Sequence, residues 1–311
     1  MMSNIKDTAS VKVYDLVDTS QPQVVLDEVR YLLTQTPSVV DPAMLERIFA
    51  DTVRLFDGQF PGYRASRTYY HDLEHTNSVF LALARLVHGG AVQGQTFAPQ
   101  NILLALTAAL FHDAGFILTE ADEDSSGAQF TIGHEARSIE FMRQYLPQYE
   151  LTPHAVEDCD HLIQCTILNL PVHAISFRSP EIKTLGKMVG TADLEAQMAD
   201  RLYLEKLPLL YKEFSEAGLP HYISELDLFQ KTEHFYQHVV QERLVHQFCN
   251  VFEWMRFHFK ERWGIDRDLY TEAIGRNLDY LQKILKEIGG GAKGVRQYLR
   301  RGVPTPPAAP T

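Results

Sequence analysis

The chain has 311 residues, of which 45% are hydrophobic, so it can bury a sizeable core. Its 40 acidic and 29 basic residues give a net charge of −11, which argues against nucleic acid as a partner because phosphate backbones need a basic surface. Three cysteines provide no disulfide framework and fit a reducing cytoplasm. There is no basic-then-apolar leader and no apolar run of about 18 residues, so we expect a cytoplasmic protein without membrane contact.

Helical periodicity governs the first two thirds of the chain. Residues 1–20 are polar with β-branched patches and predict a loose N-terminal arm. Asp41-Pro42 predicts the start of a helix that runs to Phe56, because aspartate caps helices and proline fits their first turn. The periodicity predicts further helices over 23–34, 76–89, 100–112, 133–146, 153–168 and 182–199.

The last third also has helical periodicity and is rich in aromatic residues. Helices are expected over 202–216, 226–240 and 241–262, and Asp266 is expected to cap a last helix to about Ile288. The aromatic residues fit a core, and they could also line a substrate pocket or the face of a homodimer. The sequence therefore predicts an all-α protein. It divides into an arm (1–20), a metal-binding helical domain (21–200), a helical extension packed on it (201–288) and a flexible, proline-rich tail (289–311).

Two short elements carry the chemistry. In the stretch 70–75, His71 and His75 are four residues apart and so lie on one face of a helix. The pair His112-Asp113 ends the apolar run 102–111, where an uncompensated neutral donor and anion would cost about several kcal/mol. A divalent metal supplies the compensation. Imidazole with carboxylate suits zinc, iron, manganese or nickel, and calcium less well, and magnesium is a further candidate ion.

These elements resemble the HD superfamily of metal-dependent phosphohydrolases, named for an adjacent His-Asp pair in an all-helical domain. The resemblance covers about residues 65–200 and implies an HD-type helical bundle with additional C-terminal helices. It implies that one metal is shared by His75, His112, Asp113 and a distant aspartate, Asp193. The sequence supports Asp193, which is the one acidic residue expected to face inward among apolar positions of its helix. Glu195 and Asp200 fall on other faces and are expected to be solvated.

The stretch 70–75 is also similar to the Tyr-His-Asn-x-x-His signature of cyclic nucleotide phosphodiesterases, with Asp72 in place of the asparagine. The resemblance implies that His71 protonates the leaving oxygen, a role for a group that titrates near neutral pH. Packing beside the site is the alternative role for His71. Asp72 or Glu74 could hydrogen-bond to a ligating imidazole and fix its orientation.

Two more histidines are candidates for a second metal. HD proteins with two metals often place a histidine just beyond the polar segment 120–132, where this chain has His134. The resemblance implies a second-metal ligand or a phosphate contact there, and an exposed or helix-capping histidine is the equal alternative. Another ligand usually comes from the next helix, where this chain has His161 or Cys165, and a structural role is favoured for His161. The segment 120–132 either rims the site or is a solvated acidic loop.

A metal held by these ligands would lower the pKa of a coordinated water towards ~7 and screen the charge of a phosphoryl group. We therefore predict hydrolysis of a phosphate monoester or diester, with a small, nucleotide-like phosphorylated substrate. One alternative is a di-iron HD oxygenase, which needs six ligands and so both His134 and His161. The other is a non-catalytic, nucleotide-sensing HD protein. The complete ligand set favours an enzyme, because a degenerate sensor would more often have lost a ligand.

Overall fold

The computed structural model describes residues 8–123, 125–149, 151, 154–289 and 294–305. Over this part of the chain the protein is all-α: helices alternate with short 3-10 and π-helical turns, and no β-strand is present. One isolated bridge joins Tyr63 to Thr119. The prediction of an all-α fold is confirmed. None of the helices in the described ranges has the length and apolarity that crossing a membrane requires.

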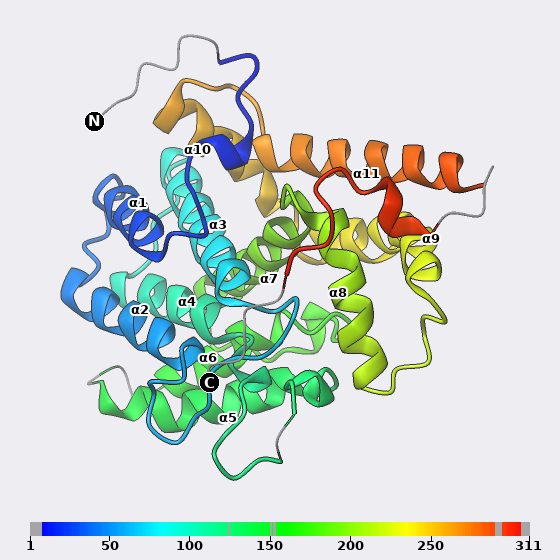
Figure 1. The fold of residues 1–311 in the computed structure, drawn as a ribbon. Coiled ribbons are helices and arrows are strands. Elements are labelled where there is room, and N and C mark those ends of the chain that lie inside the picture. Colours follow the sequence, from blue (N-terminus) through cyan, green and yellow to red (C-terminus); the bar gives the residue numbers. More distant parts are fainter. Residues whose placement is uncertain (1–7, 124, 150, 152–153, 290–293, 306–311) are drawn as a thin grey trace.

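Eleven α-helices lie within the described residues (Figure 1). They are α1 (Pro22–Thr34), α2 (Pro42–Phe56), α3 (Leu73–Val92), α4 (Pro99–Phe111), α5 (His134–Tyr145), α6 (Ala155–Gln164), α7 (Pro180–Ala199), α8 (Tyr203–Glu216), α9 (Glu225–Phe235), α10 (Trp254–Trp263) and α11 (Leu269–Ile288).

Local signals explain where many of these helices begin. Proline occupies the first turn of α1, α2, α4 and α7, where its missing N–H removes no hydrogen bond. The side chain of Asp41 caps α2 by accepting from the Ala43 N–H at 2.9 Å, as the sequence predicted. The predicted cap of α11 was wrong by two residues. Asp268 caps that helix, whereas Asp266 accepts a hydrogen bond from the Arg256 side chain at 2.8 Å.

Helices α3 and α7 form the centre of the molecule (Figure 1). Helix α3 packs against α1, α4, α7 and α10, and nearly all of its residues are buried. Helix α7 additionally contacts α6 and α11. Helices α5 and α6 lie together at one end, and α8 and α9 lie together beyond α7. Because α3 and α7 touch along their length, side chains far apart in the sequence can meet between them.

The aromatic segment is less regular than its periodicity predicted. Two π-helical turns, Tyr236–Val240 and Glu242–Gln247, continue from α9, and the chain then turns before α10. Cys249 and Asn250 have φ values of 56° and 59°, in the left-handed region that ends a helix. The predicted continuous helix over 241–262 is therefore wrong, because these two residues interrupt it.

Both terminal segments pack onto the bundle where they are described. Val13 and Val17, in the segment predicted to be a loose arm, are buried. In the segment predicted to be a flexible tail, Val295 and Leu299 are also buried, and the Arg296 guanidinium forms an ion pair with Glu225. Apolar side chains spaced four apart thus fix residues 294–299 against the helices.

Candidate metal centre

Three helices bring one group of possible metal ligands together. His75 lies in the first turn of α3, His112 directly follows α4, and Asp193 lies on the inner side of α7. The Nε2 atoms of His75 and His112 lie 3.4 and 3.5 Å from the same Asp193 carboxylate oxygen. His75 and His112 are buried and Asp193 is partly buried, and one ligand atom from each could hold a metal ion.

Asp113 joins this group from the position after His112. Its Oδ2 lies 3.2 Å from His112 Nε2 and 3.6 Å from His75 Nε2, and the side chain is 4% exposed. Two ligands in a tetrahedral or octahedral site, each about 2.1 Å from a metal, would be separated by about 3.0–3.4 Å. The four side chains therefore have nearly the separations of ligands around one ion.

The hydrogen bond on the far side of His112 fixes which nitrogen faces the cluster. Its Nδ1 lies 2.9 Å from the carbonyl oxygen of Ala109, which can only accept, so Nδ1 carries the proton. The lone pair of the neutral ring is then on Nε2 and faces the carboxylates. His112 Nε2 and Asp113 Oδ2 are both buried and form no hydrogen bond, and a cation bound to both atoms would satisfy them.

The electrostatics of the cluster favour a positive charge. Burial lowers the pKa of His112, but Asp113 and Asp193 raise it, and the net effect is well above its usual value. For Asp113 burial raises the pKa, and the nearby His112 lowers it to well below the usual range. The pKa of Asp193 is also lowered, against burial, by the nearby His112 and His75 rings. In a metal-free protein a proton on His112 supplies this positive charge.

Asp72 and Glu74, which could have oriented a ligating imidazole, interact with other groups. Asp72 caps α3, since its Oδ1 accepts from the His75 backbone N–H at 2.8 Å, and this bond places His75 at the helix start. The Glu74 carboxylate lies 3.9 Å from the Lys206 ammonium. Asp72 thus positions His75 through the backbone, not through the imidazole.

His71 has a partner that the sequence analysis missed. Its Nδ1 lies 2.7 Å from Oε2 of Glu213 in α8, and the other oxygen of this fully buried carboxylate accepts from the Tyr70 N–H at 2.6 Å. Burial lowers the pKa of His71, but the Glu213 carboxylate and, to a smaller extent, Asp113 and Asp193 raise it by more, and the resulting pKa is about 9. His71 is therefore protonated at neutral pH, and its ring stacks on Phe116 with centroids 4.4 Å apart.

The structure places His134 next to the cluster, at the start of α5. Its ring stacks on Phe116, the same ring that stacks on His71, with centroids 4.2 Å apart. Nδ1 donates to the Thr131 carbonyl at 3.1 Å, and Nε2 lies 3.4 Å from Oδ1 of Asp113. His134 is therefore on the side of Asp113 opposite the other ligands, where it could contact a second ion or a substrate.

Helix α5 is held there by close contacts with the His-Asp turn. The Ser138 hydroxyl donates to the His112 carbonyl at 2.5 Å and accepts from the Gly115 N–H at 2.8 Å. A Cβ on Gly115 would lie 1.9 Å from the His134 carbonyl oxygen, so only glycine permits this approach. Gly115 and Ser138 thus set the distance between His134 and Asp113.

His161 is not part of the ligand group formed by His75, His112 and Asp193. Its ring, on α6, packs edge-on against Phe177 with centroids 5.9 Å apart. The neighbouring Cys165 is buried, and burial raises its thiol pKa to about 12. Among the described residues, the ligand group formed by His75, His112 and Asp193 includes neither side chain.

The polar segment 120–132, which follows the His112-Asp113 pair, is partly held by contacts with α5. Asp122 accepts from the Thr119 N–H at 2.7 Å and from the Arg137 guanidinium at 2.9 Å. Arg137 also donates to the Gly115 carbonyl, which ties this segment to the His-Asp turn. Asp122 is thus engaged in the loop itself.

No protein-family model matches this chain. Nor does any curated protein show significant similarity to it.

Proposed function

We propose that this protein is a metal-dependent phosphohydrolase of the HD type, which hydrolyses a phosphate monoester or diester of a nucleotide-like molecule. The observation that carries the proposal is the convergence of His75, His112, Asp113 and Asp193 from three separate helices. Their spacing and the unpaired His112 Nε2 and Asp113 Oδ2 are what a shared cation would require.

The donor set limits the ion. Two imidazole nitrogens and two carboxylate oxygens suit zinc, manganese, iron or nickel, and magnesium less well because it prefers oxygen alone. When bound, such an ion would supply an activated water and neutralise charge on the phosphoryl oxygens. The chain itself contributes the ligands, their fixed orientation through the Ala109 and Ser138 hydrogen bonds, and a buried setting.

His71 is the proposed general acid. With its pKa raised to about 9 it carries a proton at neutral pH, and its Nδ1 is held by Glu213, so Nε2 is the nitrogen that would donate to a leaving oxygen. The Phe116 ring stacks on both His71 and His134 and so packs against both imidazoles. Glu213 acts through His71 and is therefore a positioning residue.

His134 is the proposed contact for substrate phosphate or a second ion. Its Nε2 is 3.4 Å from Asp113, whereas His161 packs against Phe177 on α6. A di-iron oxygenase would need both histidines as ligands. The hydrolase proposal needs only the four-residue cluster, and two irons per chain, bound by both histidines, would favour the oxygenase instead.

Metal analysis combined with turnover tests the proposal. Purified protein should contain bound divalent metal and should hydrolyse at least one compound in a panel of nucleotides and phosphate esters tested with added zinc, manganese, iron, nickel or magnesium. Asp193→Asn should lose both metal and turnover, whereas the matched control Asp279→Asn, on the exposed side of α11, should keep both.

The proposed acid is tested separately. His71→Ala should keep its metal and lose turnover by about 10²–10⁴-fold, the usual contribution of general acid–base catalysis. His154→Ala, at an exposed histidine, is the control. Full turnover in His71→Ala would exclude His71 as the acid. A metal-replete protein that hydrolyses no phosphate ester would leave a binding function and contradict the hydrolase.

A further inference from the structure

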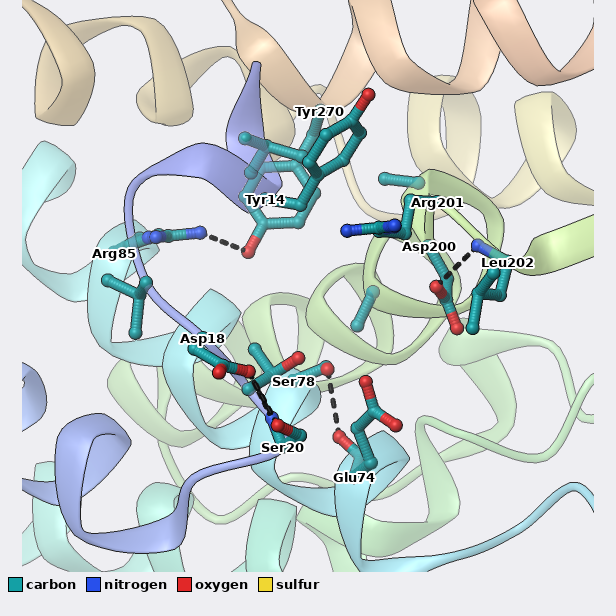
Figure 2. Close-up of a pocket in the computed structure, with 15 residues that line it drawn as sticks. Tyr14, Asp18, Ser20, Glu74, Ser78, Arg85, Asp200, Arg201, Leu202 and Tyr270 are labelled. Atoms are coloured by element: carbon teal, nitrogen blue, oxygen red, sulfur yellow. Dashed lines mark hydrogen bonds between the residues drawn. The ribbon is translucent and has the colours of Figure 1, made fainter. Parts of the chain in front are cut away.

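A second cavity lies beside α3, apart from the metal ligands (Figure 2). It has a volume of about 540 Å³, and its described lining includes none of the four metal ligands. The walls come from the segment 13–20, from α3, from the end of α7 with the residues that follow, and from α11. Cavities of about 300–1,000 Å³ hold small-molecule ligands.

Arg85 of α3 contributes a buried and incompletely paired guanidinium to this cavity. Its Nη1 donates to the Tyr270 hydroxyl at 2.9 Å, whereas Nε and Nη2 are buried and have no hydrogen-bond partner. The residue is 2% exposed, and no carboxylate forms an ion pair with it within the described chain. Buried arginines are rarely left unpaired, so the two free donors indicate an anion that the protein itself does not supply.

The acidic residues of the cavity already have partners. The Asp200 carboxylate lies 2.7 Å from the Lys206 ammonium and accepts from the Leu202 N–H. Asp18 accepts from both the backbone N–H and the hydroxyl of Ser20. Glu74, the third acidic residue of the lining, lies 3.9 Å from the same Lys206 ammonium, so none of these three carboxylates accepts a hydrogen bond from the Nε or Nη2 of Arg85.

Glu195 does not neutralise Arg85 either. This residue of α7, which the sequence led us to expect at the surface, is 1% exposed, so that expectation was wrong. Burial raises the pKa of its carboxyl group well above the usual value, which favours the uncharged form, and its buried Oε2 has no hydrogen-bond partner among the described residues. The positive charge of Arg85 thus lacks compensation from this direction as well.

A second cation faces the cavity from the other side. Figure 2 shows the guanidinium groups of Arg85 and Arg201 directed into the pocket from opposite walls, with tyrosine rings between them. The Arg201 guanidinium lies 5.5 Å from the Tyr14 ring and belongs to an exposed residue, so it can move to meet a ligand. Two guanidinium groups around one cavity favour a phosphate or carboxylate, which their planar donors match.

We propose that this cavity binds a small-molecule anion of up to nucleotide size, whose phosphate or carboxylate group pairs with Arg85 and whose remainder lies against Tyr14 and Arg201. Such a ligand would satisfy the free Nε and Nη2 donors of Arg85. The site shares α3 and α7 with the metal cluster, but its ligand does not depend on the proposed hydrolysis.

Calorimetric titration and thermal-shift measurements test the proposal on the full-length chain. The probes are inorganic phosphate, the four 5′-ribonucleoside monophosphates, succinate and citrate, all titrated in the presence of EDTA. At least one probe should bind, and the phosphate and carboxylate arms identify which group the site accepts. Arg85→Met and Arg201→Ala should each weaken binding at least tenfold.

Three controls separate this site from the metal cluster and from general loss of charge. Asp193→Asn, which removes a proposed metal ligand, should bind the same probe within twofold of wild type. Arg276→Met should do the same, since Arg276 has an equally buried, unpaired Nη2 but forms an ion pair with Glu272 and is not part of the cavity lining. Arg201→Ala decides the outcome if Arg85→Met does not fold, because Arg201 is exposed.

The proposal is overturned if no probe binds wild-type protein at millimolar concentration. It is also overturned if binding survives in Arg201→Ala and in a folded Arg85→Met, or if Asp193→Asn abolishes it. That last result would place the anion in the metal cluster. None of these outcomes depends on whether the protein hydrolyses a phosphate ester.

Discussion

The charge state of His71 should depend on Glu213, and Glu213→Gln tests this dependence. Both oxygens of the buried carboxylate are used: Oε2 lies 2.7 Å from His71 Nδ1, and Oε1 accepts from the Tyr70 N–H at 2.6 Å. Glutamine has nearly the same shape, and its carbonyl oxygen can still accept from the backbone. The substitution therefore removes the negative charge while keeping the local fold.

The expected change is large. His71 has a pKa of about 9 instead of 6.5, although burial alone would lower it. The difference corresponds to about 3 kcal/mol of preference for the charged ring, at about 1.4 kcal/mol per pKa unit. In Glu213→Gln burial is opposed only by the weaker effects of Asp113 and Asp193, so we expect the pKa of His71 to fall by at least one unit in metal-free protein.

The same shift affects stability. Because the folded pKa of His71 lies above its unfolded value of about 6.5, the His71–Glu213 pair stabilises the fold fully below that pH. This contribution declines as the pH rises through about 9. Glu213→Gln should lose part of the stability at pH 6 and show a shallower decline between pH 6.5 and 9.

Nuclear magnetic resonance titration of ¹³C-labelled histidine in the presence of EDTA measures the pKa directly, with His71→Asn used to assign the signal. Glu216→Gln is the matched control, since Glu216 lies one turn further along α8 and accepts from the exposed Ser126 hydroxyl. Its His71 should titrate as in wild type. A His71 in Glu213→Gln that still titrates near pH 9 would refute the assignment of Glu213 as the controlling charge.

Three further results are expected. EDTA should lower the melting temperature of the metal-loaded wild-type protein but not that of Asp193→Asn, because an ion that binds only the folded state stabilises it. An equal change in the wild-type protein and in Asp193→Asn would contradict the proposed ligand set. Gly115→Ala should lower the free energy of unfolding in urea by about 1–3 kcal/mol or more, since the new Cβ would lie 1.9 Å from the His134 carbonyl oxygen. If Gly115→Ala were as stable as wild type, the close packing of α5 against Gly115 would be contradicted. Burial lowers the pKa of both His88 and His258, whose Nδ1 atoms lie 3.3 Å apart. The stability that comes from keeping this pair uncharged should therefore be complete above about pH 6.5 and fall below it as the unfolded imidazoles take up protons. His258→Phe should reduce this fall, and an unchanged pH profile would exclude the pair as its cause.

The sequence predicted most helices because their signals are local. Proline in the first turn and the Asp41 cap identify where helices begin, and periodic apolar residues give their extent. The break before α10 could not be found in this way. It arises because Cys249 and Asn250 adopt left-handed backbone conformations. Asparagine often does so and gave a weak signal, but cysteine rarely does, and the apolar periodicity continues across both residues.

His112, Asp113 and Asp193 could be proposed as metal ligands from the sequence because each is a polar residue in a strongly apolar setting, whereas His75 was proposed from its spacing to His71 and from the resemblance to the HD superfamily. The same signal was available for Glu213 and was overlooked. Glu213 follows Leu207 and Leu210 at intervals of three, so it lies on the apolar stripe of α8, yet its partner His71 is 142 residues away. Periodicity shows that such a carboxylate is buried, but it cannot show which distant group the carboxylate meets.

Helix α3 illustrates why buried polar residues are informative. It passes through the centre of the molecule, where burying a charge costs several kcal/mol unless a partner compensates it. His75 faces the proposed metal ligands, and His88 pairs with His258. Arg85 lies between them in the sequence. Its guanidinium donates to the Tyr270 hydroxyl and lies 5.5 Å from the centre of the Phe259 ring, but no carboxylate of the described chain accepts a hydrogen bond from its Nε or Nη2. His75 and His88 thus meet titratable groups of the protein, whereas Arg85 lines a cavity large enough to admit an anion. A helix that stabilised the fold by packing alone would have an apolar residue at position 85, and the arginine there therefore supports the proposed ligand.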